Sequence, residues 1–188
     1  MSFFSTFAAG GFRDRRFSVE DILVMQDEGT IDESDNFELI DGEIIPMNAK
    51  LHVHERIKGK LILALARACP DHLFMGVETS LFLSERTFVE PDICIYPESL
   101  QSDEVKAPDI VLAIEVAVST LAYDLGRKAQ AYARHGLREL WVIDAMARRT
   151  FIHRGASARG WARITEHGPD FELTIAAVPG FRLRLDAI

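Results

Sequence analysis

The fold of this chain is decided by three stretches: TFVEPDICIY at residues 87–96, DIVLAIEVAV at 109–118 and STLAYDLGRKAQAY at 119–132. The first two are rich in β-branched residues and predict strands, and the third has the apolar spacing of a helix, which we expect over 121–135. Asp92 lies on the first strand, Glu115 on the second and Lys128 on the helix. If the strands are neighbours, the two carboxylates and the lysine can hold a divalent metal and activate water.

The surroundings of Glu115 and Lys128 strengthen this hypothesis. The Glu115 strand is apolar on both faces, which predicts a central strand, and a carboxylate there is costly unless it is paired or bound to a metal. On a helical wheel Lys128 shares the core-facing side with Leu125, Ala129 and Tyr132. Such a lysine either extends to solvent or meets an acid. A structural ion pair and a functional site both remain open.

The residues before Thr87 predict two helices, a β-hairpin and a strand. Ser18, with Asp21 three residues on, suits a helix N-cap, and Gly29 suits a helix end. Asp41-Gly42 is a preferred two-residue turn between apolar runs. The predicted elements are a helix over 17–29, a β-hairpin over 37–47, a helix over 51–69 and strands over 73–84 and 87–96.

The residues after this unit predict more sheet. ELWVID at 139–144 reads as another buried strand, and short strands separated by Gly- and Pro-containing turns follow at 150–153, 161–165, 171–176 and 181–185. The order of strands and helices predicts an α/β fold with a β-rich C-terminus. We expect an N-terminal arm over residues 1–16 and a single domain over 17–188.

The net charge of the chain bears on whether it binds nucleic acid. The 188 residues carry a net charge of −8, which disfavours nucleic-acid binding because phosphate contacts need Lys and Arg. The charge is uneven, since residues 121–188 hold 11 Lys and Arg against 7 Asp and Glu, whereas residues 1–120 hold 10 against 22. The arginines of the cationic part either contact phosphates or form an ordinary solvated face; they are Arg148, Arg149, Arg154, Arg159 and Arg163.

Other classes are excluded by what the sequence lacks. Two cysteines, Cys69 and Cys94, give neither a disulfide framework nor a Cys-based metal site. No apolar run approaches the length of about 20 residues that spans a bilayer, and the N-terminal basic cluster follows the apolar part, the wrong order for a secretory signal. The motifs of NTPases, dinucleotide enzymes, serine hydrolases and zinc proteases are missing. We therefore expect a cytoplasmic protein without membrane contact or organic cofactor.

An ordered set of motifs resembles a known family. The set is FELIDGE (37–43), His54, VEPDICIY (89–96), IEVA (114–117), YDLGRKAQAYARHG (123–136) and LWVID (140–144). In this order and spacing it is similar to the Uma family of putative restriction endonucleases, within the PD-(D/E)XK nuclease superfamily. The similarity covers roughly residues 17–155, and the order of the motifs is more specific than any one of them.

The resemblance implies a fold and a chemistry. The fold is restriction-endonuclease-like, with a mixed β-sheet flanked by helices and, here, additional antiparallel strands at the C-terminus. The implied activity is that of an endonuclease that hydrolyses DNA with Mg²⁺ or Mn²⁺, often as a homodimer. Asp92 and Glu115 would be the metal ligands and Lys128 the catalytic lysine, while Glu38 and His54 would line the site.

The sequence departs from the superfamily at two positions. The usual lysine, two residues after the glutamate, is replaced by Ala117, so that Lys128 would supply the charge from the helix, a relocation common in this family. The segment AVSTLA at 117–122 is more apolar than the pattern leads one to expect, notably at Val118.

Two competing hypotheses follow. Val118 and the net charge of −8 favour a catalytically impaired module that binds nucleic acid or protein on the same fold. A structural or oligomerisation protein is the other alternative, and it predicts Lys128 in a salt bridge with Glu115 inside a closed interior. The alternatives to a site role are an ordinary core histidine for His54 and a surface or capping carboxylate for Glu38.

Overall fold

The computed structural model describes residues 15–32, 35–47, 49, 51–101 and 104–188. The expected N-terminal arm, residues 1–16, lies almost wholly outside these described residues. The chain divides into two compact units, Met1–Ala49 with Phe82–Val89 and Lys50–Leu81 with Glu90–Ile188. In the described part of the chain, no helix has the length and apolar character to cross a membrane.

The first unit begins with helix α2 (Val19–Asp27). The predicted cap is present, because the Ser18 hydroxyl accepts the backbone N–H of Asp21 while the Asp21 carboxylate accepts the backbone N–H of Ser18. Two reciprocal hydrogen bonds of this kind satisfy backbone donors that a helix start leaves unpaired. The chain leaves the helix at Gly29, which has a φ of 69°.

A four-stranded sheet completes the first unit, in the order β2-β1-β5-β4. Its strands are β1 (Phe37–Ile40), β2 (Glu43–Pro46), β4 (Leu81–Ser84) and β5 (Thr87–Val89). β1 and β2 form the predicted hairpin, and both turn residues, Asp41 and Gly42, have positive φ. Positive φ at both positions is what a two-residue hairpin turn requires.

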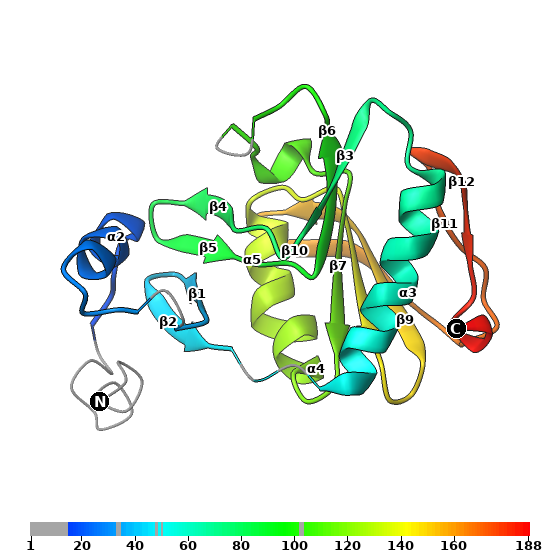
Figure 1. Cartoon of the computed structure of the whole chain (residues 1–188), viewed down its shortest axis with the longest axis horizontal. Helices are drawn as coiled ribbons and strands as arrows, with labels where there is room; N and C mark the ends of the chain where they lie inside the picture. The colour runs from blue at the N-terminus through cyan, green and yellow to red at the C-terminus, as the bar shows by residue number, and fades with distance from the viewer. Residues whose placement is uncertain (1–14, 33–34, 48, 50, 102–103) are drawn as a thin grey trace. The chain divides into compact units, whose positions relative to one another are not determined.

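The second unit is built on a six-stranded sheet in the order β10-β9-β8-β7-β6-β3. Its strands are β3 (Leu73–Val77), β6 (Ile93–Pro97), β7 (Leu112–Ala117), β8 (Glu139–Asp144), β9 (Arg149–Ser157) and β10 (Gly160–His167). β7 and β8 are parallel, and the other pairs are antiparallel. The sheet is therefore mixed, as predicted, with β7 and β8 at its centre; Figure 1 shows β7 beside β6.

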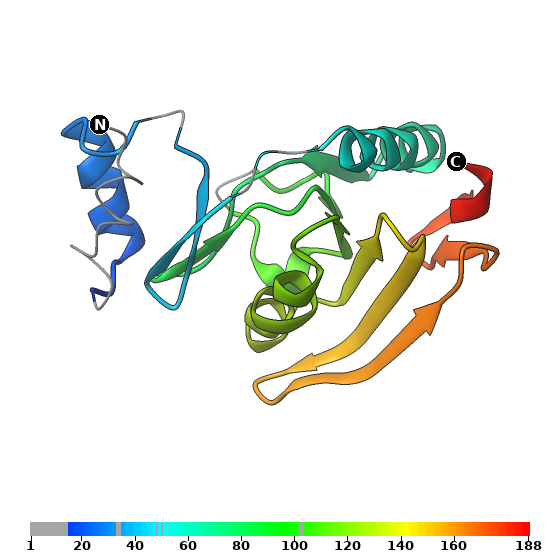
Figure 2. The ribbon, with the colours of Figure 1, turned by 90° about the horizontal axis from the view of Figure 1, so that it is seen from below.

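Helices flank this sheet, and a small antiparallel pair of strands follows it. Helix α3 (His52–Ala68) and the helical run α4 (Leu121–Tyr123), η3 (Asp124–Lys128) and α5 (Ala129–Arg134) lie on opposite sides of the sheet (Figure 2). The C-terminal pair consists of β11 (Leu173–Ile175) and β12 (Val178–Leu183). Short 3₁₀ turns are formed by η2 (Ala107–Asp109) and η4 (Leu185–Ala187).

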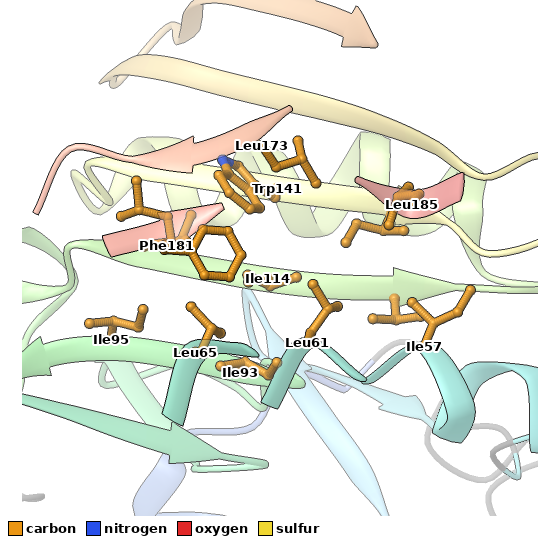
Figure 3. Close-up of a cluster of buried hydrophobic side chains, with 14 of the residues drawn as sticks. Ile57, Leu61, Leu65, Ile93, Ile95, Ile114, Trp141, Leu173, Phe181 and Leu185 are labelled. Atoms are coloured by element: carbon orange, nitrogen blue, oxygen red, sulfur yellow. The ribbon is translucent and has the colours of Figure 1, made fainter. Parts of the chain in front are cut away.

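The main core lies on the α3 side of the six-stranded sheet. Leu61 and Leu65 of α3 are fully buried beside Ile93 and Ile114 of the sheet (Figure 3). Burying side chains of this size contributes about 1.5–3 kcal/mol each. Because neighbouring residues of a strand point to opposite faces, burial of Ile114 against α3 directs Glu115 to the other face of β7.

Two predicted strands are wrong in their extent. The sequence predicts uninterrupted strands over 73–84 and 87–96, whereas each is broken and its two parts belong to different sheets. One break contains Glu78, which has a φ of 50°. The other contains Pro91, which cannot donate to a strand ladder. The second break places Asp92 in a bend directly before β6.

The helix predicted over 121–135 is present but not uniform. Its middle, Asp124–Lys128, is a π-helical segment between two α-helical ones. Segments of this kind are rare and are frequent at functional sites. Lys128, which meets Glu115, is its last residue, and Tyr132, which also meets Glu115, lies in the α-helical segment that follows.

Candidate metal and catalytic site

Glu115 meets Lys128 on the helix-covered face of β7. Lys128 Nζ donates a hydrogen bond of 2.8 Å to Glu115 Oε2. The two side chains are only 4% and 5% exposed, so that water screens the pair little. Burial of this kind is tolerated only when both charges are well paired, because each ion loses its hydration.

Tyr132 holds the other oxygen of the same carboxylate. Its hydroxyl donates a hydrogen bond of 2.7 Å to Glu115 Oε1, and the residue is fully buried. Tyr132 lies four residues after Lys128, and residues at this spacing share one face of a helix. Lys128 has a further acceptor, the backbone carbonyl of Glu90, at 3.3 Å. Two side chains of the helical run therefore donate hydrogen bonds to the two carboxylate oxygens of Glu115.

Short side chains on β7 allow this approach. Ala113 and Ala117 point to the same face as Glu115 by strand alternation, and both are fully buried. A lysine at position 117, as in the usual superfamily pattern, would occupy this face. Lys128 instead reaches Glu115 from the helix, and its role as the catalytic lysine stays a prediction.

Asp92 is fixed against the backbone of β7. Its Oδ2 accepts a hydrogen bond of 2.7 Å from the N–H of Val116, the residue that follows Glu115. β6 and β7 pair Ile93 with Ile114, and Asp92 and Glu115 are the sequence neighbours of these two residues. The two candidate ligands, 23 residues apart in the sequence, therefore both adjoin the same pair of the sheet.

His54 supports Asp92 from helix α3. His54 Nε2 lies 3.1 Å from the Asp92 carboxylate, and both residues are buried. His54 Nδ1 lies 2.9 Å from Glu55 Oε1, which also accepts a hydrogen bond of 2.8 Å from Lys58. Lys58 in turn pairs with Glu78, whose backbone N–H donates to the Asp92 carbonyl at 3.2 Å. The network closes on itself at Asp92.

The charges of this network shift the pKa values of His54, Lys58 and Glu55. Burial, the largest single influence, lowers the pKa of His54, but the hydrogen bond and charge of Asp92, helped by Glu55, outweigh it and leave this pKa above its ordinary value. Burial also lowers the pKa of Lys58, and its two carboxylate partners raise it above the ordinary value. The Lys58 hydrogen bond holds the pKa of Glu55 below its usual range. His54 is thereby favoured as a cation against Asp92.

Of the five site residues predicted from the sequence, four lie in the second unit: Asp92, Glu115, Lys128 and His54. Glu115 meets Lys128, and Asp92 meets His54. Glu38 lies on β1 of the first unit and is 2% exposed, and its place in the site stays a prediction.

Sequence reasoning missed four residues that contact the predicted ones or each other: Tyr132 beside Glu115, and Glu55, Lys58 and Glu78 of the network around Asp92. Tyr132 was expected on the core-facing side, and its spacing from Lys128 was the available signal. Lys58 had the same kind of signal, because it lies four residues after His54. The residues of the network between α3 and β3 come from separate elements, and no local pattern joins them.

Two of the five C-terminal arginines, Arg149 and Arg154, are engaged with acids. Arg154 binds both oxygens of Glu139, at 2.7 and 2.9 Å. Arg149 lies 2.6 Å from Glu166 and 3.5 Å from Asp144. These pairs favour the solvated face over a set of arginines held ready for phosphate.

The donor set fits a hard divalent cation. Asp92 and Glu115 offer buried carboxylate oxygens, the ligand type that Mg²⁺ and Mn²⁺ prefer. Within the described ranges, no three His, Cys, Asp or Glu side chains group closely enough to hold a metal alone. Water or substrate oxygens would therefore complete the coordination, as is usual for Mg²⁺ in phosphate-processing sites.

Comparison with known proteins agrees with the expected resemblance. The model of a family described as "Uma2: Putative restriction endonuclease" matches residues 19–186. A solved structure, a putative nuclease belonging to DUF820 from Anabaena variabilis ATCC 29413, has the same fold, with a TM-score of 0.72 and 14% identity over 90% of this chain and 96% of that chain. No curated protein matches the sequence significantly. The chain therefore belongs to the Uma2 family of putative restriction endonucleases.

Proposed function

We propose that this protein is a metal-dependent endonuclease that hydrolyses DNA phosphodiester bonds. The observation that carries the proposal is the buried Glu115–Lys128 pair, together with a second buried carboxylate, Asp92, in the bend before β6, which binds the backbone of β7. Two acids from neighbouring parts of the sheet and a lysine from the covering helix suit phosphodiester hydrolysis, in which negative charge develops on a phosphate. Membership of the Uma2 family supports the same reaction class.

Asp92 and Glu115 would hold Mg²⁺ or Mn²⁺, which when bound polarises water and the scissile phosphate. The remaining residues act through position and charge. His54 and the Val116 N–H fix the Asp92 carboxylate, so that it does not rotate away from β7. Lys128 places one positive charge beside Glu115, where it stabilises charge that develops on a phosphate oxygen.

The competing hypotheses explain part of this site. A purely structural role predicts the Glu115–Lys128 salt bridge, and that salt bridge is present. It does not account for Asp92, a second buried acid whose partners, His54 and a backbone N–H, would not be needed to neutralise Lys128. The binding-module hypothesis is compatible with all of these contacts, and it differs from the proposal only because it predicts no hydrolysis.

The test is a titration of Mn²⁺ into wild-type protein and Glu115→Ala, followed by incubation of each with supercoiled plasmid DNA and Mg²⁺. The proposal expects binding heat and plasmid nicking for wild type and neither for the variant. Glu166→Ala, which removes an exposed carboxylate from β10, is the matched control and should behave as wild type. Equal heats and no nicking in all three proteins would overturn the proposal, and DNA binding without nicking would favour the binding module.

A homodimer and a cytoplasmic location stay predictions of the resemblance and of the sequence. Sedimentation equilibrium of the purified protein measures the first directly. A dimer would bring two copies of the site to one DNA molecule, so that a monomeric result would predict nicks in one strand before double-strand breaks.

A further inference from the structure

We infer that Tyr132 is the positioning residue of Glu115. Its hydroxyl fixes Oε1, and Oε2 is left as the oxygen that Lys128 and a divalent cation occupy in turn. This inference rests on the proposed function, because it concerns how the same site accepts its metal. The family resemblance assigns no role to Tyr132.

The contacts divide the Glu115 carboxylate between two different donors. Tyr132 donates to Oε1 at 2.7 Å and Lys128 donates to Oε2 at 2.8 Å. Both donors are buried, at 0% and 3% exposure. With each oxygen held from the same helix, the carboxylate cannot rotate without losing both hydrogen bonds.

The two donors differ in charge, and this difference decides which of them a cation displaces. An ammonium next to a divalent cation is repelled strongly at low effective dielectric. A neutral phenol carries no such penalty and remains a good hydrogen-bond donor to a carboxylate. A cation at Glu115 is therefore expected to take Oε2 from Lys128, while Tyr132 keeps Oε1.

Lys128 keeps a hydrogen-bond acceptor after a cation displaces it from Glu115 Oε2. Its second acceptor is the carbonyl of Glu90, at 3.3 Å, two residues before Asp92. The ammonium thus keeps a partner beside the second candidate ligand. In the metal-free protein Lys128 balances the charge of Glu115, which a buried carboxylate requires.

The test compares Tyr132→Phe with wild type by calorimetric titration of Mn²⁺ and by thermal melting without metal. Removing a hydrogen-bond partner of a metal ligand typically weakens metal affinity 10–100-fold, and we expect a loss in that range for Tyr132→Phe. Plasmid nicking by the variant should return toward the wild-type rate at saturating Mn²⁺, because the ligands themselves are intact. Tyr96→Phe, the same change in a buried tyrosine of β6, is the matched control and should leave the Mn²⁺ affinity unchanged.

The outcomes separate the inference from the proposed function. If Tyr132→Phe binds Mn²⁺ within twofold of wild type while Glu115→Ala does not bind, the positioning role is wrong and the metal site stands. If Tyr96→Phe loses as much affinity as Tyr132→Phe, the effect is general and the positioning role is also wrong. If wild type and Glu115→Ala give equal heats, the proposed function fails and the inference fails with it.

A second measurement covers the case in which Tyr132→Phe does not fold. The chain has 3 tyrosines, so protein grown with 3-fluorotyrosine gives a ¹⁹F spectrum that Tyr96→Phe and Tyr123→Phe variants assign. Saturating Mg²⁺ should shift the ¹⁹F resonance of position 132. The reason is that the Glu115 carboxylate, to which Tyr132 donates, exchanges Lys128 for the cation. An unchanged resonance at position 132, in protein that binds Mg²⁺, would overturn the inference.

Discussion

The backbone N–H of Val116 donates a hydrogen bond of 2.7 Å to the Asp92 carboxylate. Val116 directly follows Glu115, so this bond fixes one candidate metal ligand to the strand that carries the other. Asp92 stands outside the ladder of β6, in the bend after Pro91. The break in the strand therefore gives the site its geometry, because it frees the Asp92 side chain to turn toward β7.

Replacing Lys128 should destabilise the protein as well as stop hydrolysis. Lys128→Met leaves Glu115 buried without its ammonium, and removing one partner of a buried ion pair typically costs about 3–5 kcal/mol. We expect a loss of that size in the free energy of unfolding measured with urea. Lys60→Met, an exposed change on α3, is the control and should change it by no more than about 0.5 kcal/mol. The double variant Glu115→Gln/Lys128→Met should lose less than the sum of the two single changes, and simple additivity would mean that the pair is not coupled.

The His54–Asp92 contact should make stability depend on pH. The folded-state pKa of His54 is raised above its ordinary value of 6.5, so its contribution is complete below that value and is lost as pH rises through the folded-state pKa. His54→Gln should therefore cost more stability at about pH 5.5 than at about pH 8.5, with up to about 1.5–3 kcal/mol at the acid end for a charge-assisted hydrogen bond. The measurement is urea unfolding at both pH values. His52→Gln, an exposed change on the same helix, should show no such difference, and an equal cost for His54→Gln at both pH values would contradict the ion pair.

Cys94 should be inert in the native protein. It lies on β6 two residues after Asp92, is fully buried, and its burial raises its pKa to about 12. The thiolate is the reactive form, so iodoacetamide at about pH 8 should label Cys94 only after unfolding. Mass spectrometry of the Cys69→Ser variant, with and without denaturant, measures this. Rapid labelling of the native variant would show that the strand beside the site opens readily.

Local patterns predicted much of the fold because the physics that carries them is local. The Ser18 cap and the Asp41-Gly42 turn depend on backbone geometry within a few residues, and both are present. The central strand around Glu115 was predictable because its apolar residues are incompatible with an exposed face. The inward direction of Lys128 followed from helical periodicity, and its burial at 3% exposure agrees with that prediction.

The errors arise where tertiary contacts override local pattern. In 87–96 the sequence signals an irregular position at Pro91, and the strand breaks there. In 73–84 the break contains Glu78, which meets Lys58. The Lys58 contact joins residues 20 positions apart, which no local periodicity encodes. The π-helical segment ending at Lys128 has no established sequence signal, so the predicted helix was drawn as regular.

Whether Asp92 and Glu115 hold one divalent cation between them is tested most directly by a crystal structure of the protein soaked with Mn²⁺, with anomalous scattering used to locate the metal. We expect an anomalous peak within ligand distance of both carboxylates, with Lys128 moved off Glu115 Oε2. A soaked crystal with Mn²⁺ bound elsewhere and the Glu115–Lys128 salt bridge intact would contradict this expectation.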